Sequence, residues 1–141
     1  MTDFAEYGHA LVAIVGLALL QLVLGPLSAM RKTRAGLAPG AQPPADYADG
    51  GYRWHRAYGN LVESMPAFVG LVLAAILAGG SPFWVNLFAS GFLLLRILLA
   101  VVHINGIGKP DMGLRSFTYV AGWLMCLGLA YLVVKAVFLN G

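Results

Sequence analysis

Long runs of apolar residues alternate with short polar segments along this chain. No Asp, Glu, Lys or Arg occurs from Tyr7 to Met30, and none occurs from Ser64 to Leu95. A third uncharged run covers Ser116 to Val134. A helix needs about 20 apolar residues to cross the hydrocarbon core of a bilayer. The pattern therefore predicts membrane-spanning helices.

The second of these runs is too long for one ordinary span and contains a turn signal, GGSP, at Gly79 to Pro82. It is therefore interpreted as a helical hairpin of two spans. Polar, Gly- and Pro-containing loops are expected at residues 35–51 and 104–114. The fold class predicted is all-α, a four-helix transmembrane bundle in which residues 1–141 form one membrane domain. The spans are expected at about residues 7–30, 56–78, 82–103 and 116–137.

The basic residues predict an orientation for this bundle. Seven of the nine Lys and Arg residues lie in the two expected loops or at their edges, whereas the 79–82 turn has none. Loops enriched in Lys and Arg remain in the cytoplasm. We therefore expect loops 31–55 and 104–115 on the cytoplasmic side and both termini on the outer side. Lys135 is the exception, and its long side chain can extend to the outer interface.

Composition supports the membrane assignment and excludes several function classes. Hydrophobic residues make up 60% of the chain and charged residues 11%, whereas soluble domains are usually about 25% charged. The net charge of +3 is explained by topology, so no nucleic-acid partner is expected. The single cysteine, Cys126, permits no disulfide within the chain, and the three histidines have no metal-binding spacing, so we expect no metal site.

The N-terminal segment lacks the basic start and the small-residue cleavage site of a signal peptide. We therefore expect the first apolar run to be kept as a membrane span.

Polar residues within the expected spans are the candidates for function. Arg56, Asn60 and Glu63 are spaced i, i+4, i+7, which places them on one face of the second helix, and Arg53 precedes them by one turn. Arg96, on the third helix, is expected at a membrane depth similar to that of Glu63. Because a charge inside a membrane is costly unless it is paired, we expect Glu63 and Arg96 to form an ion pair.

The fourth span begins with a second group of polar residues. Arg115 and Tyr119 are spaced i, i+4, and Ser116 follows Arg115 directly. All these side chains are expected at the cytoplasmic ends of their helices, where they would form a basic pocket above Glu63. Its ligand should be anionic and also carry an ammonium group. Alternatively, the arginines are interfacial anchors, Asn60 holds helices together, and the charged pair is structural.

Two motifs resemble those of the MAPEG superfamily, the membrane-associated proteins in eicosanoid and glutathione metabolism. The segment RWHRAYGNLVESMPAF, residues 53–68, resembles the family pattern R-x-x-R-A-x-x-N-x-x-E-x-x-P at the start of the second helix. Gly108-Lys109 followed by LRSFTY, residues 114–119, resembles the family's third-loop and fourth-helix motif. The residues that match the first pattern are Arg53, Arg56, Ala57, Asn60, Glu63 and Pro66.

The resemblance implies a homotrimer of four-helix bundles that binds glutathione as co-substrate between neighbouring subunits. It implies that Arg115 faces the glutathione thiol with Ser116 nearby, as the catalytic pair. A nearby cation lowers the pKa of a thiol, and the resulting thiolate can attack a lipophilic electrophile that enters from the bilayer. The glutathione-binding residues implied are Arg53, Arg56, Asn60, Glu63 and Tyr119.

The chain departs from the eicosanoid enzymes of the family at two places. Ser64 follows Glu63 where many of those enzymes carry tyrosine, and the end of the third span, VVHINGIGK, contains no tyrosine. The chain therefore resembles the small bacterial-type members, and eicosanoid synthesis is not expected.

Three functions remain open from the sequence. The first is a membrane glutathione transferase or peroxidase, and the second is a non-catalytic family relative that binds a ligand. The third is a small multidrug transporter that uses Glu63 to couple protons to cations. The arginines near Glu63 argue against this third function, because they favour an ionised carboxylate and repel cationic drugs.

Overall fold

The computed structural model describes residues 3–109 and 113–139 of the chain, and these residues form a bundle of four long helices without a strand. A short 3-10 helix, η1 (Phe4–Tyr7), leads into α1. A single π-helical turn, η2 (Lys135–Leu139), continues the last helix. All four long helices are long and apolar enough to cross a membrane, so the chain is a multi-pass membrane protein. The long helices are α1 (Gly8–Arg34), α2 (Gly50–Leu77), α3 (Pro82–Ile104) and α4 (Leu114–Val134).

The expected spans 7–30, 82–103 and 116–137 correspond to α1, α3 and α4 with its π-helical extension. The second span begins six residues earlier than expected, at Gly50 instead of residue 56. Asp49 explains the difference, because its side chain accepts a hydrogen bond from the backbone N–H of Tyr52 at 2.7 Å and so caps the helix. The early start places Arg53 on α2 itself instead of in the preceding loop.

Two prolines lie inside helices, Pro26 in α1 and Pro66 in α2, and both helices continue through them. The first loop thus covers residues 35–49. The second loop was expected at residues 104–114, and its residues 110–112 lie outside the described part of the chain. Residues 1–2 and 140–141, the ends of the predicted 1–141 domain, also lie outside it.

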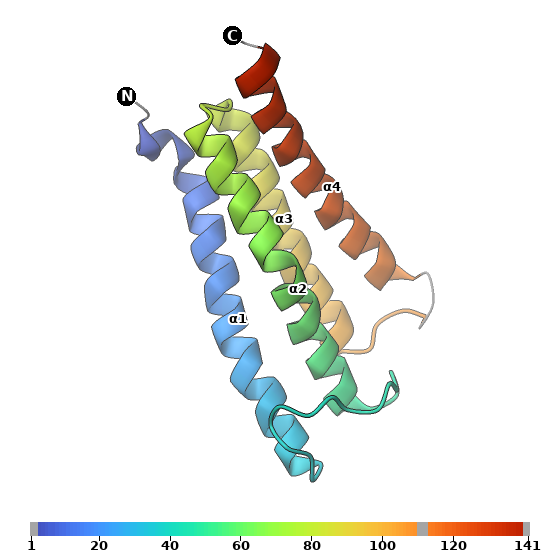
Figure 1. Ribbon diagram of the computed structural model, residues 1–141. Helices are drawn as coiled ribbons and strands as arrows, with labels where there is room; N and C mark the ends of the chain where they lie inside the picture. The colour runs from blue at the N-terminus through green and yellow to red at the C-terminus, as the bar shows by residue number, and fades with distance from the viewer. Residues whose placement is uncertain (1–2, 110–112, 140–141) are drawn as a thin grey trace.

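Figure 1 shows how the helices are arranged. α2 and α3 form an antiparallel pair, and α1 and α4 lie on opposite sides of it. Both described ends of the chain lie at the same end of the bundle as the α2–α3 turn. We call this the turn end, and the opposite end, where both loops lie, the loop end.

Most of the fully buried apolar side chains lie in the half of the bundle towards the turn end. Phe68 and Phe92 stack there with ring centroids 4.2 Å apart and an interplanar angle of 9°, and neither ring is exposed. The Tyr7 hydroxyl donates to the Gly80 carbonyl at 2.6 Å, which ties η1 to the turn. Other fully buried side chains of this half are Val72, Ala75, Ile76, Val85 and Ala89.

Candidate functional site

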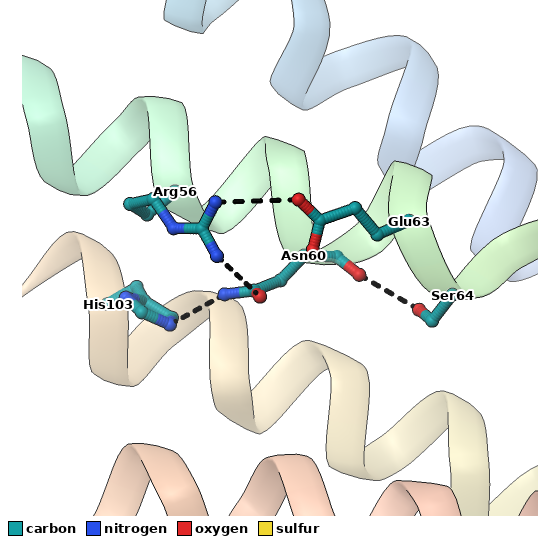
Figure 2. A network of polar contacts seen from close by, with 5 residues as sticks. All are labelled: Arg56, Asn60, Glu63, Ser64 and His103. Carbon is teal, nitrogen blue, oxygen red and sulfur yellow. Dashed lines mark hydrogen bonds and ion pairs between the residues drawn. The ribbon is translucent and has the colours of Figure 1, made fainter. Parts of the chain in front are cut away.

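Two helices, α2 and α3, contribute to one chain of polar contacts near the loop end, shown in Figure 2. The Arg56 guanidinium lies 3.5 Å from a Glu63 carboxylate oxygen and donates at 3.2 Å to the side-chain oxygen of Asn60. The Asn60 amide nitrogen lies 2.8 Å from Nε2 of His103 on α3. The three α2 residues therefore share one face, as their spacing predicted.

His103 belongs to this network although it was not among the residues singled out from the sequence. Because the Asn60 oxygen accepts from Arg56, the Asn60 nitrogen faces His103 as a donor. His103 Nε2 must then accept, which leaves the ring neutral with its proton on Nδ1. The histidine is 3% exposed and stacks on Tyr47 of the first loop at 6.0 Å. It holds Asn60 in the orientation that receives Arg56.

Arg115 brings a second arginine to the same place from the first turn of α4. One of its terminal nitrogens, Nη2, donates to the Lys109 carbonyl at 2.6 Å, and the guanidinium lies 3.8 Å from the centre of the Tyr47 ring. The other, Nη1, is buried and has no hydrogen-bond partner among the residues that the structure describes. A buried charged donor without a partner is unfavourable, so this nitrogen is available to an anionic ligand.

These side chains surround a cavity of about 310 Å³. Ligand pockets are commonly about 300–1,000 Å³, so a small peptide-sized ligand is compatible with this volume. Six of the seven residues singled out from the sequence line it. The lining residues are Tyr47, Arg56, Asn60, Glu63, His103, Arg115, Ser116, Tyr119 and Val120.

Arg53 is the seventh residue singled out, and it does not line this cavity. Its guanidinium donates at 2.8 Å to the backbone carbonyls of Tyr47 and Ala48 and at 3.3 Å to that of Ile104. It thereby fastens the first loop to the end of α3 and holds Tyr47 over the cavity. In this conformation Arg53 supports the site from outside.

The expected ion pair between Glu63 and Arg96 is wrong for this structure. Glu63 pairs with Arg56, seven residues earlier on the same helix, and its side chain remains 56% exposed. Arg96 is instead 3% exposed and lies against the rings of Phe92 and Tyr119, 4.6 and 4.9 Å from their centres. Similar depth on neighbouring helices was not enough, because Arg56 on the same helix holds the Glu63 carboxylate while the Arg96 guanidinium packs on aromatic rings.

The cavity is lined by two arginines, one carboxylate and three hydroxyl-bearing side chains within a small volume. Two separate arginines can each bind a carboxylate, and the exposed carboxylate of Glu63 can receive an ammonium group. The arrangement suits a zwitterion with more than one acidic group.

A comparison with known protein families decides the class of the protein. The model of the MAPEG family matches residues 10–135, which includes all four long helices in whole or in large part. The chain belongs to the MAPEG family. Membership supports a glutathione-related transferase or peroxidase role, or a related role within the family. No curated protein matches the chain significantly.

The two MAPEG motifs therefore lie where the polar cavity is. Sequence reasoning found the α2 and α4 residues because their spacing puts them on common faces. It missed Tyr47, which lies in the first loop, and His103, which stands in the segment where the absence of tyrosine had been noted. A polar residue near the inner end of an apolar span was the available signal for His103.

Proposed function

We propose that this MAPEG protein is a glutathione-dependent transferase or peroxidase that acts on lipophilic electrophiles. The observation that carries the proposal is the cavity in which Arg56, Asn60 and Glu63 of α2 face Arg115, Ser116 and Tyr119 of α4. Glutathione has two carboxylates, one ammonium group and one thiol, and the donors and acceptors of this cavity match the charged groups.

In this proposal the α2 residues hold the ends of the tripeptide. Arg56 binds a carboxylate in its fork, Glu63 receives the ammonium group, and Asn60 contributes its amide. Arg53 reaches glutathione only if it releases the loop carbonyls that it holds here. While it holds these carbonyls, Arg53 contributes by positioning the first loop.

In this proposal Arg115 stabilises the thiolate of glutathione. Its unpartnered Nη1 in a buried site favours the thiolate over the neutral thiol, because the cation stabilises the negative sulfur. The Ser116 and Tyr119 hydroxyls are the nearby donors. The thiolate then forms a carbon–sulfur bond with the electrophile, and the leaving group departs with the bonding electrons.

The assembly and orientation belong to the same proposal. The family resemblance implies a homotrimer, and many large apolar side chains on the outer faces, such as Leu22 and Leu77, are available to lipid or to neighbouring subunits. The distribution of Lys and Arg supports a cytoplasmic loop end. Glutathione would then reach the cavity from the cytoplasm, and the electrophile from the bilayer.

The test uses the purified full-length protein in detergent. Isothermal calorimetry should detect glutathione binding, and a chlorinated dinitrobenzene should be conjugated faster than in buffer. Failure of both measurements would overturn the proposal. Binding without conjugation would support the second candidate, the non-catalytic relative.

The transporter function is disfavoured by the ion pair of Arg56 with Glu63. The Arg56 guanidinium occupies the carboxylate that a cationic drug would need, and its charge repels that drug. Proton-driven uptake of a cationic drug into liposomes, abolished by Glu63→Gln, would reverse this ranking.

A further inference from the structure

Tyr47 of the first loop lies against Arg115 of α4, and the proposed reaction gives this tyrosine no role. The central carbon of the Arg115 guanidinium is 3.8 Å from the centre of the Tyr47 ring, which is direct contact. The same ring stacks on His103, with centroids 6.0 Å apart and an interplanar angle of 22°. Tyr47 therefore packs against two residues of the polar cavity, although it belongs to a loop.

Two contacts fix the Arg115 guanidinium. Its Nη2 donates to the Lys109 carbonyl at 2.6 Å, and the whole group lies over the face of the Tyr47 ring. The residue is 7% exposed, and Nη1 is buried without a hydrogen-bond partner in the part of the chain that the structure describes. With the Lys109 contact alone, the group could turn and give Nη1 to water. The ring prevents this.

An aromatic ring is well suited to hold this cation. Its face attracts a guanidinium but accepts none of the N–H bonds in the manner of an oxygen, so Nη1 of Arg115 remains available to a ligand. The ring also keeps water away from the charge. A charge shielded from water acts more strongly on a neighbouring anion.

Arg53 holds the ring in its place. Its guanidinium donates at 2.8 Å to the carbonyls of Tyr47 and Ala48 and at 3.3 Å to that of Ile104, and bonds from a charged donor are strong. Gly106 leaves room for this side chain, because a Cβ there would lie 3.2 Å from Arg53 atoms and its φ is +64°. Arg53 therefore ties the backbone of Tyr47 to the end of α3.

We propose that Tyr47 is a positioning residue that acts through Arg115. Its ring keeps the Arg115 guanidinium shielded from water and fixed in the orientation that stabilises the thiolate, and Arg53 holds the ring through the first loop. The inference rests on the proposed function, because it assigns Tyr47 to the ionisation of glutathione. The ring is required, and the hydroxyl is not.

The first experiment contains no glutathione. Phenylglyoxal modifies accessible arginines, and mass spectrometry of the full-length protein in detergent follows each site. Arg115 should react slowly in wild type and in Tyr47→Phe, which keeps the ring, and several-fold faster in Tyr47→Leu. The exposed Arg34 is the internal reference and should react alike in all proteins. Tyr131→Leu, which removes an exposed ring of α4, is the matched control and should behave as wild type.

The second experiment measures the ionisation of bound glutathione from the ultraviolet absorbance of its thiolate as a function of pH. At neutral pH a free thiol is mostly protonated, and Arg115 in the wild-type protein should favour the thiolate. Tyr47→Leu should lower the ionisation constant of the bound thiol about tenfold, so that the thiolate appears at higher pH. Tyr47→Phe should keep the wild-type profile. Glutathione affinity at acidic pH should change little, because α2 holds the ends of the tripeptide.

The double variant tests whether Arg53 acts through the ring. Arg53→Met should lower the ionisation constant of the bound thiol as Tyr47→Leu does. The two substitutions together should lower it no further than Tyr47→Leu alone, because residues that act through one contact are not additive. Thermal unfolding in detergent establishes that each variant is folded. A further decrease in the double variant would show that Arg53 acts independently of Tyr47.

Equal Arg115 modification in wild type and Tyr47→Leu would overturn the inference. Equal thiol ionisation in these two proteins would overturn it as well and leave the proposed function standing. Loss of ionisation in Tyr47→Phe would assign the role to the hydroxyl and contradict the proposal. A wild-type protein that ionises no glutathione overturns the proposed function and this inference with it.

Discussion

The two halves of the bundle differ in whether their buried polar side chains are hydrogen-bonded within the chain. Near the turn end, Tyr7 and Asn86 bond to backbone groups, and Asn86 both accepts from Ala10 N–H at 2.9 Å and donates to the Glu6 carbonyl at 2.7 Å. Towards the loop end and the middle of the bundle, Arg115, His103 and Arg96 have buried nitrogens without partners in the described residues. Near the turn end, these polar side chains are satisfied by hydrogen bonds within the chain. Towards the loop end, buried N–H donors remain that a ligand could satisfy.

The same helices therefore carry residues that stabilise the fold in one half and residues proposed to bind a ligand in the other. We call the half near the turn end the sealed half and the half near the loop end the open half. α2 contributes Phe68 to the sealed half and Asn60 to the open half, and the two residues are about two helical turns apart. Unsatisfied buried donors are rare in proteins and reduce stability, so their gathering in one half of the bundle favours a binding site there. Variants in the two halves should therefore fail in different assays.

The largest effect is expected from Phe68→Ala in the sealed half. Phe68 is unexposed and stacked on Phe92 at 4.2 Å, so its removal leaves a cavity. Large-to-small core substitutions of this kind cost about 3–5 kcal/mol. Thermal unfolding in detergent should shift strongly downwards, while the conjugation rate per folded protein remains close to wild type. A normal unfolding temperature would show that this half is not the stabilising one.

Arg115→Ala should produce the next largest effect, and in the opposite assay. It removes the donor assigned to the thiolate, and the loss of one such donor lowers kcat by about 10²–10³-fold. Lys135→Ala, which removes a cation beyond the other end of α4, is the matched control and should leave the rate unchanged. Equal rates for Arg115→Ala and wild type would remove Arg115 from the mechanism.

His103→Leu tests whether the polar network positions Asn60. The substitution leaves the Asn60 amide without its 2.8 Å partner, and an unsatisfied buried group costs about 1–3 kcal/mol. Glutathione affinity measured by calorimetry should fall about tenfold, since 1.4 kcal/mol corresponds to tenfold at room temperature. Asn105→Ala is the control, because within the described part of the chain the Asn105 side-chain amide donates only to the exposed carbonyl of Val101 in the last turn of α3. A similar decrease in both variants would argue against a specific role for His103.

Tyr7→Phe should give the smallest effect. It removes the 2.6 Å hydrogen bond to Gly80 while keeping the ring. The expected cost is about 1 kcal/mol, visible as a small decrease in the unfolding temperature. Glutathione binding should not change, because the bond lies at the end of the bundle away from the polar cavity. Weaker glutathione binding in this variant would show that the two halves are coupled.

The sequence alone determined the number of spans, their approximate bounds and the polar stripe of α2. These features depend on local periodicity: an uncharged run of sufficient length must form a helix in lipid, and residues at i, i+4, i+7 share a face of it. The same reasoning put Arg115 and Tyr119 on one face of α4, and both line the polar cavity.

Only the tertiary structure decided which side chains meet across helices. The contact of Asn60 with His103, the placing of Arg96 against Tyr119 instead of Glu63, and the use of Arg53 to hold the first loop all depend on how each helix is rotated about its axis. Spacing within one helix gives depth and face but contains no information about the rotation of its neighbour. Packing of the apolar faces sets that rotation, and with it the partners of every polar side chain in the bundle.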